Sequence, residues 1–144
     1  MIDAARQTQL RQTIEQFYFA YRAFTAQPDR ILEQRGLNRV HHRILYFVAH
    51  QPSCSVNELL NTLQVSKQAL NTPLRQLLEM KLLTSTADNQ DRRIKRIALT
   101  EAGKKLETQL TLTQMKQLET VFQNHSATAQ TAWLNIMTAI AKQT

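Results

Sequence analysis

The sequence contains little cysteine and few residues that break helices. Its 144 residues include a single cysteine, Cys54, so no disulfide can form within the chain, in agreement with a reducing compartment. Two glycines and three prolines leave few breakers for a many-stranded all-β fold, and we therefore expect a mainly helical protein. The length is that of one ordinary domain, which argues against a multidomain enzyme.

Long apolar runs and a recognisable leader are also missing. The longest unbroken apolar run covers residues 44–49, far short of the roughly 20 residues that cross a bilayer. Residues 1–7 lack the basic region followed by an apolar region that marks a secretory signal. We therefore expect a soluble protein that stays in the cytoplasm and has no membrane partner.

The chain is basic, and the excess charge lies in its middle. Lys and Arg number 18 against 11 Asp and Glu, a net charge of +7. Residues 38–105 hold eleven basic and five acidic residues, so this stretch carries +6 of that charge. A field of this sign attracts a phosphate backbone without selecting a sequence. A basic surface that only aids solubility is the alternative.

Apolar spacing predicts helices in the first third of the chain. Apolar side chains between residues 10 and 24 recur every three or four positions, which indicates an amphipathic helix. Pro28 and Gly36 bracket a short separate segment, 29–35, because proline favours the first turn of a helix and glycine the position after the last. Asn38 is a suitable N-cap for a helix that runs to Ala49.

Two further helices follow at the spacing of a helix-turn-helix. Ser55 and Glu58 fit a capping box at the start of the first helix. Ser66 is placed to cap the second helix, in which leucines at residues 70–78 recur at helical spacing. Only three or four residues separate the two helices, so the pair must cross steeply.

A β-hairpin with a basic tip is predicted next. Residues 82–86 and 94–99 are typical of strands, residues 88–91 form a polar turn between them, and Thr100 then caps another helix. A helix-turn-helix followed by a two-stranded hairpin predicts a winged helix-turn-helix, in which the hairpin is the wing and lies beside the second helix.

The two ends of the chain carry apolar stripes that a winged helix does not require. Residues 106–122 and 133–140 contain such stripes on two long predicted helices. These helices and the N-terminal one must bury their stripes against each other or against a second copy of the chain. We favour a homodimer, and a monomer whose ends fold back onto the core is the alternative.

Polar and basic side chains of the second helix and the wing are candidate DNA contacts. Gln and Asn pair with adenine, and Arg with guanine, in the major groove, whereas a long basic side chain on a wing suits a narrow minor groove. A merely solvated polar face is the alternative for the helix, and strand alternation keeps some basic wing residues away from DNA. The candidate DNA-binding residues are Ser66, Lys67, Gln68, Asn71, Thr72, Arg75, Arg92, Arg93 and Lys95.

Over about residues 17–106 the chain resembles winged-helix regulators of the MarR type. The motifs that carry this resemblance are RVHHRIL at 39–45, SVNELL at 55–60, VSKQAL at 65–70 and, most specific, DRRIKRIALTEAG at 91–103. The resemblance implies a single MarR-like domain, with a DNA-binding core at 38–105 and dimerisation helices at 1–36 and 106–144. It also implies that the dimer binds a pseudo-palindromic operator, usually as a repressor, and that Asp91 orients a wing arginine, here Arg93.

One residue departs from the family pattern. Pro73 stands about seven residues into the second helix, the recognition helix, where the family usually has a helix former. Proline lacks a backbone donor and clashes with the carbonyl of Ala69, so we expect a bend or a break. Arg75 lies beyond the proline and is the less secure of the predicted contacts.

The resemblance further implies a small aromatic effector in the cleft between the dimerisation and DNA-binding regions. Such an effector favours a dimer whose recognition helices no longer match half-sites one helical turn apart. Core packing explains the same side chains equally well. The candidate effector-binding residues are Tyr18, Tyr21, His41, His42 and Tyr46.

Other functions have less support in the sequence. Cys54 precedes the Ser55 cap, where a helix dipole lowers the pKa of a thiol, so a redox-responsive regulator is one alternative. A winged-helix module that binds an acidic protein is another. The sequence shows no Gly-rich phosphate loop, nucleophile with a base, carboxylate pair or cluster of metal ligands, so we expect no enzyme, metal or cofactor.

Overall fold

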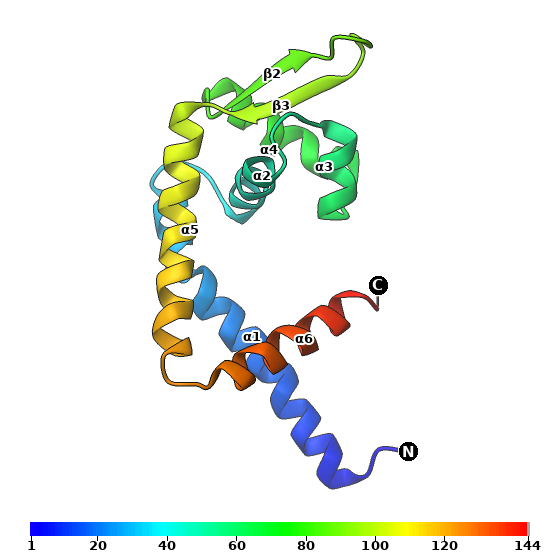
Figure 1. Ribbon diagram of the computed structural model, residues 1–144, viewed down its shortest axis with the longest axis vertical. Helices are drawn as coiled ribbons and strands as arrows, with labels where there is room; N and C mark the ends of the chain where they lie inside the picture. Colours follow the sequence, from blue (N-terminus) through cyan, green and yellow to red (C-terminus); the bar gives the residue numbers. More distant parts are fainter. Residues whose placement is uncertain (144) are drawn as a thin grey trace.

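The structure is a computed structural model that describes residues 1–143, in which six helices accompany a small sheet that lies at one end of the molecule (Figure 1). The helices are α1 (Ala4–Glu33), α2 (Arg39–His50), α3 (Val56–Leu63), α4 (Lys67–Glu79), α5 (Glu101–Phe122) and α6 (Ala127–Ala141). The strands are β1 (Cys54–Ser55), β2 (Leu83–Ala87) and β3 (Lys95–Leu99). This order confirms the predicted, mainly helical winged helix-turn-helix fold. No helix within residues 1–143 has the length and apolar character needed to cross a membrane.

The N-terminal helix is longer than predicted because Pro28 does not interrupt it. Helix α1 runs without a break from Ala4 to Glu33, so the separate segment predicted at 29–35 is wrong. Proline at position 28 removes the N–H that would bond to the Phe24 carbonyl. In its place, Nε2 of Gln114 in α5 donates to the Phe24 carbonyl oxygen at 3.4 Å. The hydrogen bond from α5 thus satisfies the Phe24 carbonyl, which has no donor within its own helix because residue 28 is a proline.

The predicted N-caps of the helices form. Asn38, Ser55, Ser66 and Thr100 each accept a backbone N–H of the helix that follows. At α3 the capping box is complete, because the Glu58 carboxylate also accepts the backbone N–H of Ser55 at 3.4 Å. These caps fix where the helix-turn-helix begins and where its second helix, α4, starts.

The sheet has one strand more than the predicted hairpin. Its order is β1-β3-β2, with antiparallel pairing throughout. In β1, Cys54 pairs with Ile97 and Ser55 with Arg96. Two residues are too few to give a periodic signal in a sequence, so this strand was not predicted. It joins the inner edge of the wing to the start of α3.

The apolar core lies among the helix-turn-helix, α2, the upper part of α5 and the sheet. Ten of its large side chains are almost fully buried: Leu32, Ile44, Leu45, Leu59, Leu70, Leu77, Leu82, Ile97, Leu106 and Leu110. They come from every described helix except α6. The core therefore holds the helix-turn-helix and the base of the wing in one body.

The N-terminal half of α1 and the whole of α6 extend away from this core (Figure 1). On α1, Ile14 is 67% exposed and Phe17 is 50% exposed. Helix α6 has no buried residue among those described, and its Leu134 and Ile136 are largely exposed. The predicted apolar stripes therefore exist, but a single chain does not fold them back onto its core.

Candidate nucleic-acid interface

Helix α4 presents its predicted contact residues on its solvent side. Leu70, Leu74 and Leu77 bury the opposite side against the core. The Ser66 hydroxyl accepts the backbone N–H of Ala69 at 3.1 Å and so begins the helix. The structure places every predicted polar residue of this segment at an exposed position: Ser66, Lys67, Gln68, Asn71, Thr72 and Arg75.

Pro73 does not interrupt α4. The helix is continuous from Lys67 to Glu79, so of the bend or break that the sequence predicts, the break is absent. Ala69, whose carbonyl loses its helical donor, is exposed, and water can take the donor's place. Arg75 follows the proline on the same helix, with its Nε 3.9 Å from Glu79 Oε1. The exposed polar face thus extends past the proline.

A hydrogen bond that the sequence did not reveal joins α4 to α2. His41 is 2% exposed, and its Nε2 lies 2.7 Å from Oε1 of Gln76 in α4. Its Nδ1 accepts the backbone N–H of Asn38 at 3.0 Å, which places the ring proton on Nε2 as the donor to Gln76. One imidazole therefore caps α2 and fixes the recognition helix. Its partner is 35 positions away, so no local pattern could have found it.

In the wing, Asp91 binds Arg93, as the resemblance implied. The Nε and Nη2 atoms of Arg93 donate to the two Asp91 carboxylate oxygens, each at 3.0 Å. The side-chain hydrogen bond from Arg93 is the main cause that lowers the pKa of Asp91. Arg92 and Lys95 are exposed, and neither forms an ion pair with any residue in the described part of the chain. Arg92 is therefore free to reach a groove.

Arg96, which we did not select as a contact, binds two carboxylates. Its Nη1 donates to Glu58 Oε1 at 2.9 Å, and its Nε donates to Asp88 Oδ1 at 3.1 Å. Oδ2 of Asp88 also accepts the backbone N–H groups of Gln90 and Asp91, each at 3.0 Å. These backbone hydrogen bonds, followed by the one from Arg96, lower the pKa of Asp88.

The five candidate effector residues lie in different surroundings. Tyr18 and Tyr21 are exposed on α1, His41 and His42 are buried on α2, and Tyr46 is half-buried. His41 is engaged with α4, as described above. The structure does not gather the five side chains around one cavity, so their joint role stays a prediction.

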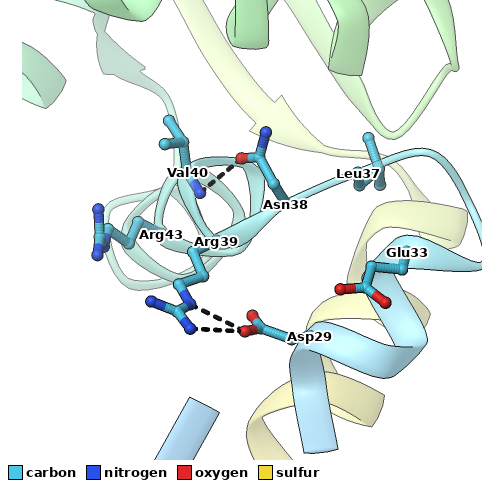
Figure 2. Close-up of a pocket in the computed structure, with 7 residues that line it drawn as sticks. All are labelled: Asp29, Glu33, Leu37, Asn38, Arg39, Val40 and Arg43. Carbon is cyan, nitrogen blue, oxygen red and sulfur yellow. Dashed lines mark hydrogen bonds and ion pairs between the residues drawn. The ribbon is translucent and has the colours of Figure 1, made fainter. Parts of the chain in front are cut away.

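An open pocket of about 370 Å³ lies where α1 meets α2 (Figure 2). Two Arg39 nitrogens contact Asp29 Oδ2 at 2.9 Å on one side of it. Nη2 of Arg43 donates to the Tyr21 hydroxyl at 2.6 Å, which makes Tyr21 a neighbour of the pocket although it does not line it. The lining residues are Asp29, Glu33, Leu37, Asn38, Arg39, Val40 and Arg43.

His42 is buried where α2 packs on α5. Its Nε2 lies 3.3 Å from the Thr111 hydroxyl, which itself donates to Glu107 Oε2 at 2.5 Å. Burial lowers the pKa of His42, and the nearby Glu107 and Asp29 carboxylates oppose that shift only in part. The neutral ring therefore forms part of the junction between the winged-helix core and the α5 arm.

Cys54 lacks the surroundings of a reactive thiol. Its side chain is 3% exposed. Burial, followed by the Glu58 carboxylate, raises the pKa of the Cys54 thiol. The lowered pKa on which the redox alternative depends is therefore absent, because burial and the Glu58 carboxylate outweigh the opposing effects of a backbone hydrogen bond and Arg96.

Two comparisons of the sequence with known proteins agree. Residues 35–94 match the model of the MarR family. The HTH-type transcriptional regulator PetP of Rhodobacter capsulatus is 37% identical over 132 residues, which cover 92% of this chain and 80% of that protein.

Solved structures show the same fold. The MarR family transcription regulator SP03579 superposes with a TM-score of 0.81 at 21% identity, covering 96% of this chain and 91% of that one. The S. aureus MepR chain from a MepR–DNA complex superposes with a TM-score of 0.74 at 23% identity. The superposition covers 89% of this chain and 95% of the MepR chain. Together with the 37% identical relative and the family match, these findings show that the chain belongs to the MarR family of transcriptional regulators.

Proposed function

We propose that the protein is a homodimer that binds a pseudo-palindromic operator in duplex DNA and represses transcription until a small aromatic effector releases it. The observation that carries this proposal is the combination of two features on one rigid core. One is the exposed polar face of α4, and the other is Arg92 of the wing, which is exposed and has no ion-pair partner among residues 1–143.

The chemistry of α4 suits the major groove. Gln68, Asn71 and Arg75 follow one another at spacings of three and four residues, so they share one face of the helix. Amide side chains pair with adenine and guanidinium groups with guanine. The helix begins at the exposed residues Ser66 and Lys67, and the free backbone N–H groups of a helix N-terminus suit a phosphate oxygen as acceptor. MepR, a structural neighbour, has been crystallised with DNA.

The exposed arms support the dimer. Helix α6 carries four large apolar side chains that are at least 44% exposed in a single chain, and α1 carries further ones. Several exposed large apolar side chains on one helix are typical of a protein interface. A twofold dimer presents two recognition helices, which read half-sites about 34–36 Å apart.

We place effector binding at the junction of α1, α2 and α5. Tyr21 and His42 lie there, between the arms and the DNA-binding core. A ligand at a junction changes DNA binding only if it binds the two arrangements of the dimer with different affinity. An aromatic acid would meet the guanidinium groups of Arg39 and Arg43 in the adjoining pocket.

Selection of bound sites from a pool of random duplexes tests this proposal. We expect the purified protein to enrich a twofold symmetric motif whose half-sites are one helical turn apart. Enrichment of an asymmetric site, or of none, would contradict it. If the basic face instead binds an acidic protein, as in the alternative function, duplex binding will lack the steep salt dependence of phosphate contacts.

A further inference from the structure

The outer half of the wing has little apolar support. In β2 only Leu83 is buried, and the next four residues are exposed. In β3 only Ile97 is buried. Beyond the pair of Thr86 with Arg96, where the pairing with β1 also ends, the hairpin extends past the core as a two-stranded ribbon. Such a ribbon is marginally stable in water on its own, so its direction depends on other contacts.

Arg96 supplies those contacts at the point where apolar support ends. It stands one position outside Ile97 and pairs with Thr86 of β2 and with Ser55 of β1, the last residue of that strand. Its guanidinium joins Asp88, at the turn of the hairpin, to Glu58, in the first turn of α3. Both carboxylates are already held, since Asp88 accepts two backbone N–H groups and Glu58 caps α3. Ordered partners reduce the entropy lost when the arginine binds them.

The same geometry argues against a direct contact between Arg96 and DNA. Its side chain is 32% exposed, whereas that of Arg93 in the same wing is 91% exposed. One guanidinium with two carboxylates carries a net charge of −1, which repels a phosphate. The free positive charges of the wing lie farther out, at Arg92 and Lys95.

We propose that Arg96 is a positioning residue that holds the wing against α3, so that Arg92 reaches the minor groove while α4 occupies the major groove. Arg96 acts through Arg92 and does not itself bind DNA. This inference rests on the proposed DNA-binding function and adds the residue that sets the angle between its two contact elements.

A double-mutant cycle of Arg96→Met with Arg92→Ala tests the proposal, because methionine keeps the aliphatic stem and removes both ion pairs. We expect Arg96→Met alone to weaken binding to the selected operator about five- to tenfold, and the double variant to bind no more weakly than Arg92→Ala. The slope of the logarithm of the binding constant against the logarithm of the salt concentration should decrease in the double variant by the amount that corresponds to about one lost phosphate contact, not two. Arg35→Met, an equal charge change at an exposed position between α1 and α2, should leave binding near the wild-type value.

Two outcomes of the cycle overturn the proposal. The first is that Arg96→Met binds the operator as tightly as wild type. The second is that the fold-losses in affinity of the two single variants multiply in the double variant, as expected for two independent phosphate contacts. Should Arg96→Met fail to fold, Glu58→Gln is used in the same cycle, because it keeps an acceptor for the cap and removes the ion pair.

Hydrogen exchange without DNA separates this proposal from the proposed function. In Arg96→Met we expect faster exchange at the Asp88 amide, which donates to the Ile94 carbonyl across the base of the turn, and unchanged exchange in α4. Unchanged exchange at Asp88 overturns the positioning role even if the protein binds DNA. Faster exchange in a protein that binds no duplex would contradict the proposed function and leave the structural connection standing.

Discussion

A Cβ atom on Gly103 would stand 2.0 Å from the carbonyl oxygen of Leu82. Helix α5 begins directly against the segment that enters β2, and the Thr100 N–H also donates to that oxygen at 3.1 Å. The Thr100 hydroxyl donates to the Lys81 carbonyl oxygen at 2.6 Å. Only a residue without a side chain lets the helix come this close, so Gly103 fixes how the α5 arm leaves the winged helix.

We expect Gly103→Ala to lower the free energy of unfolding by at least about 1–3 kcal/mol, the usual cost of overpacking, since backbone must move to admit the methyl group. Chemical denaturation followed by circular dichroism measures this change. Lys105→Ala, two positions along the same turn and exposed, is the control and should stay within about 0.5 kcal/mol of wild type. Equal stability of Gly103→Ala and wild type would show that the approach of α5 to Leu82 is not as close as described.

Arg92→Ala should weaken operator binding at least tenfold and reduce its dependence on salt, because Arg92, unlike Arg93 and Arg96, has no carboxylate partner in the described part of the chain. Fluorescence anisotropy over a range of salt concentrations measures both effects. Arg35→Ala removes the same charge from the exposed connection between α1 and α2 and serves as the control. Wild-type binding by Arg92→Ala at physiological salt removes the wing from the mechanism.

The exposed arms predict that single polar substitutions dissociate the dimer. Leu134 in α6 is 58% exposed and Ile14 in α1 is 67% exposed within one chain. Leu134→Asp and Ile14→Asp should therefore leave the fold intact while placing a buried charge in the interface. Sedimentation velocity should show single chains, and operator binding should weaken. Asn124→Asp, in the exposed corner between α5 and α6, should remain dimeric, and dimers of normal stability in both arm variants would exclude these faces from the interface.

His42 predicts a loss of stability on mild acidification. Its pKa is lowered in the folded protein, so below about pH 6.5 the unfolded chain binds a proton that the folded chain resists. The free energy of unfolding should therefore fall as the pH decreases from about 7.5 to 5.5, and His42→Gln should reduce that fall. Urea titrations at several pH values measure the free energy of unfolding of both proteins. The exposed His125→Gln is the control, and identical pH dependence of His42→Gln and wild type would exclude His42 as the cause.

Cys54 should react slowly in the folded protein, because the thiol is buried and its pKa is raised. A thiol-specific chromogenic reagent should modify it rapidly only after unfolding, and peroxide should leave operator binding unchanged. Cys54→Ala identifies any effect of peroxide on other residues. Reversible loss of binding in the wild type but not in Cys54→Ala would restore the redox alternative.

Features that depend on neighbouring residues could be predicted from the sequence. The caps at Asn38, Ser55, Ser66 and Thr100 use residues within three positions, and the leucines of α4 repeat at helical spacing. The exposed face of α4 follows from that spacing, because the positions between buried leucines must point to solvent. The wing motif, likewise, carries the Asp91–Arg93 pair within three residues.

Features that depend on residues far apart in the chain could not be predicted from the sequence. Local preference places a break at Pro28, but Gln114, 90 positions away, bonds to the Phe24 carbonyl that the proline leaves free. His41 with Gln76 and Arg96 with Glu58 are separated by 35 and 38 positions, so only the fold brings them together. The family resemblance suggested the five candidate effector residues, and the packing of α1 and α2 places their side chains in different surroundings.

The stoichiometry of the complex on DNA tests the central claim most directly. Sedimentation equilibrium of the wild-type chain with a duplex that carries the selected motif should give a mass of two chains per duplex, and the affinity should fall steeply as salt rises. One chain per duplex, or binding no stronger than to heparin under the same conditions, would contradict the account.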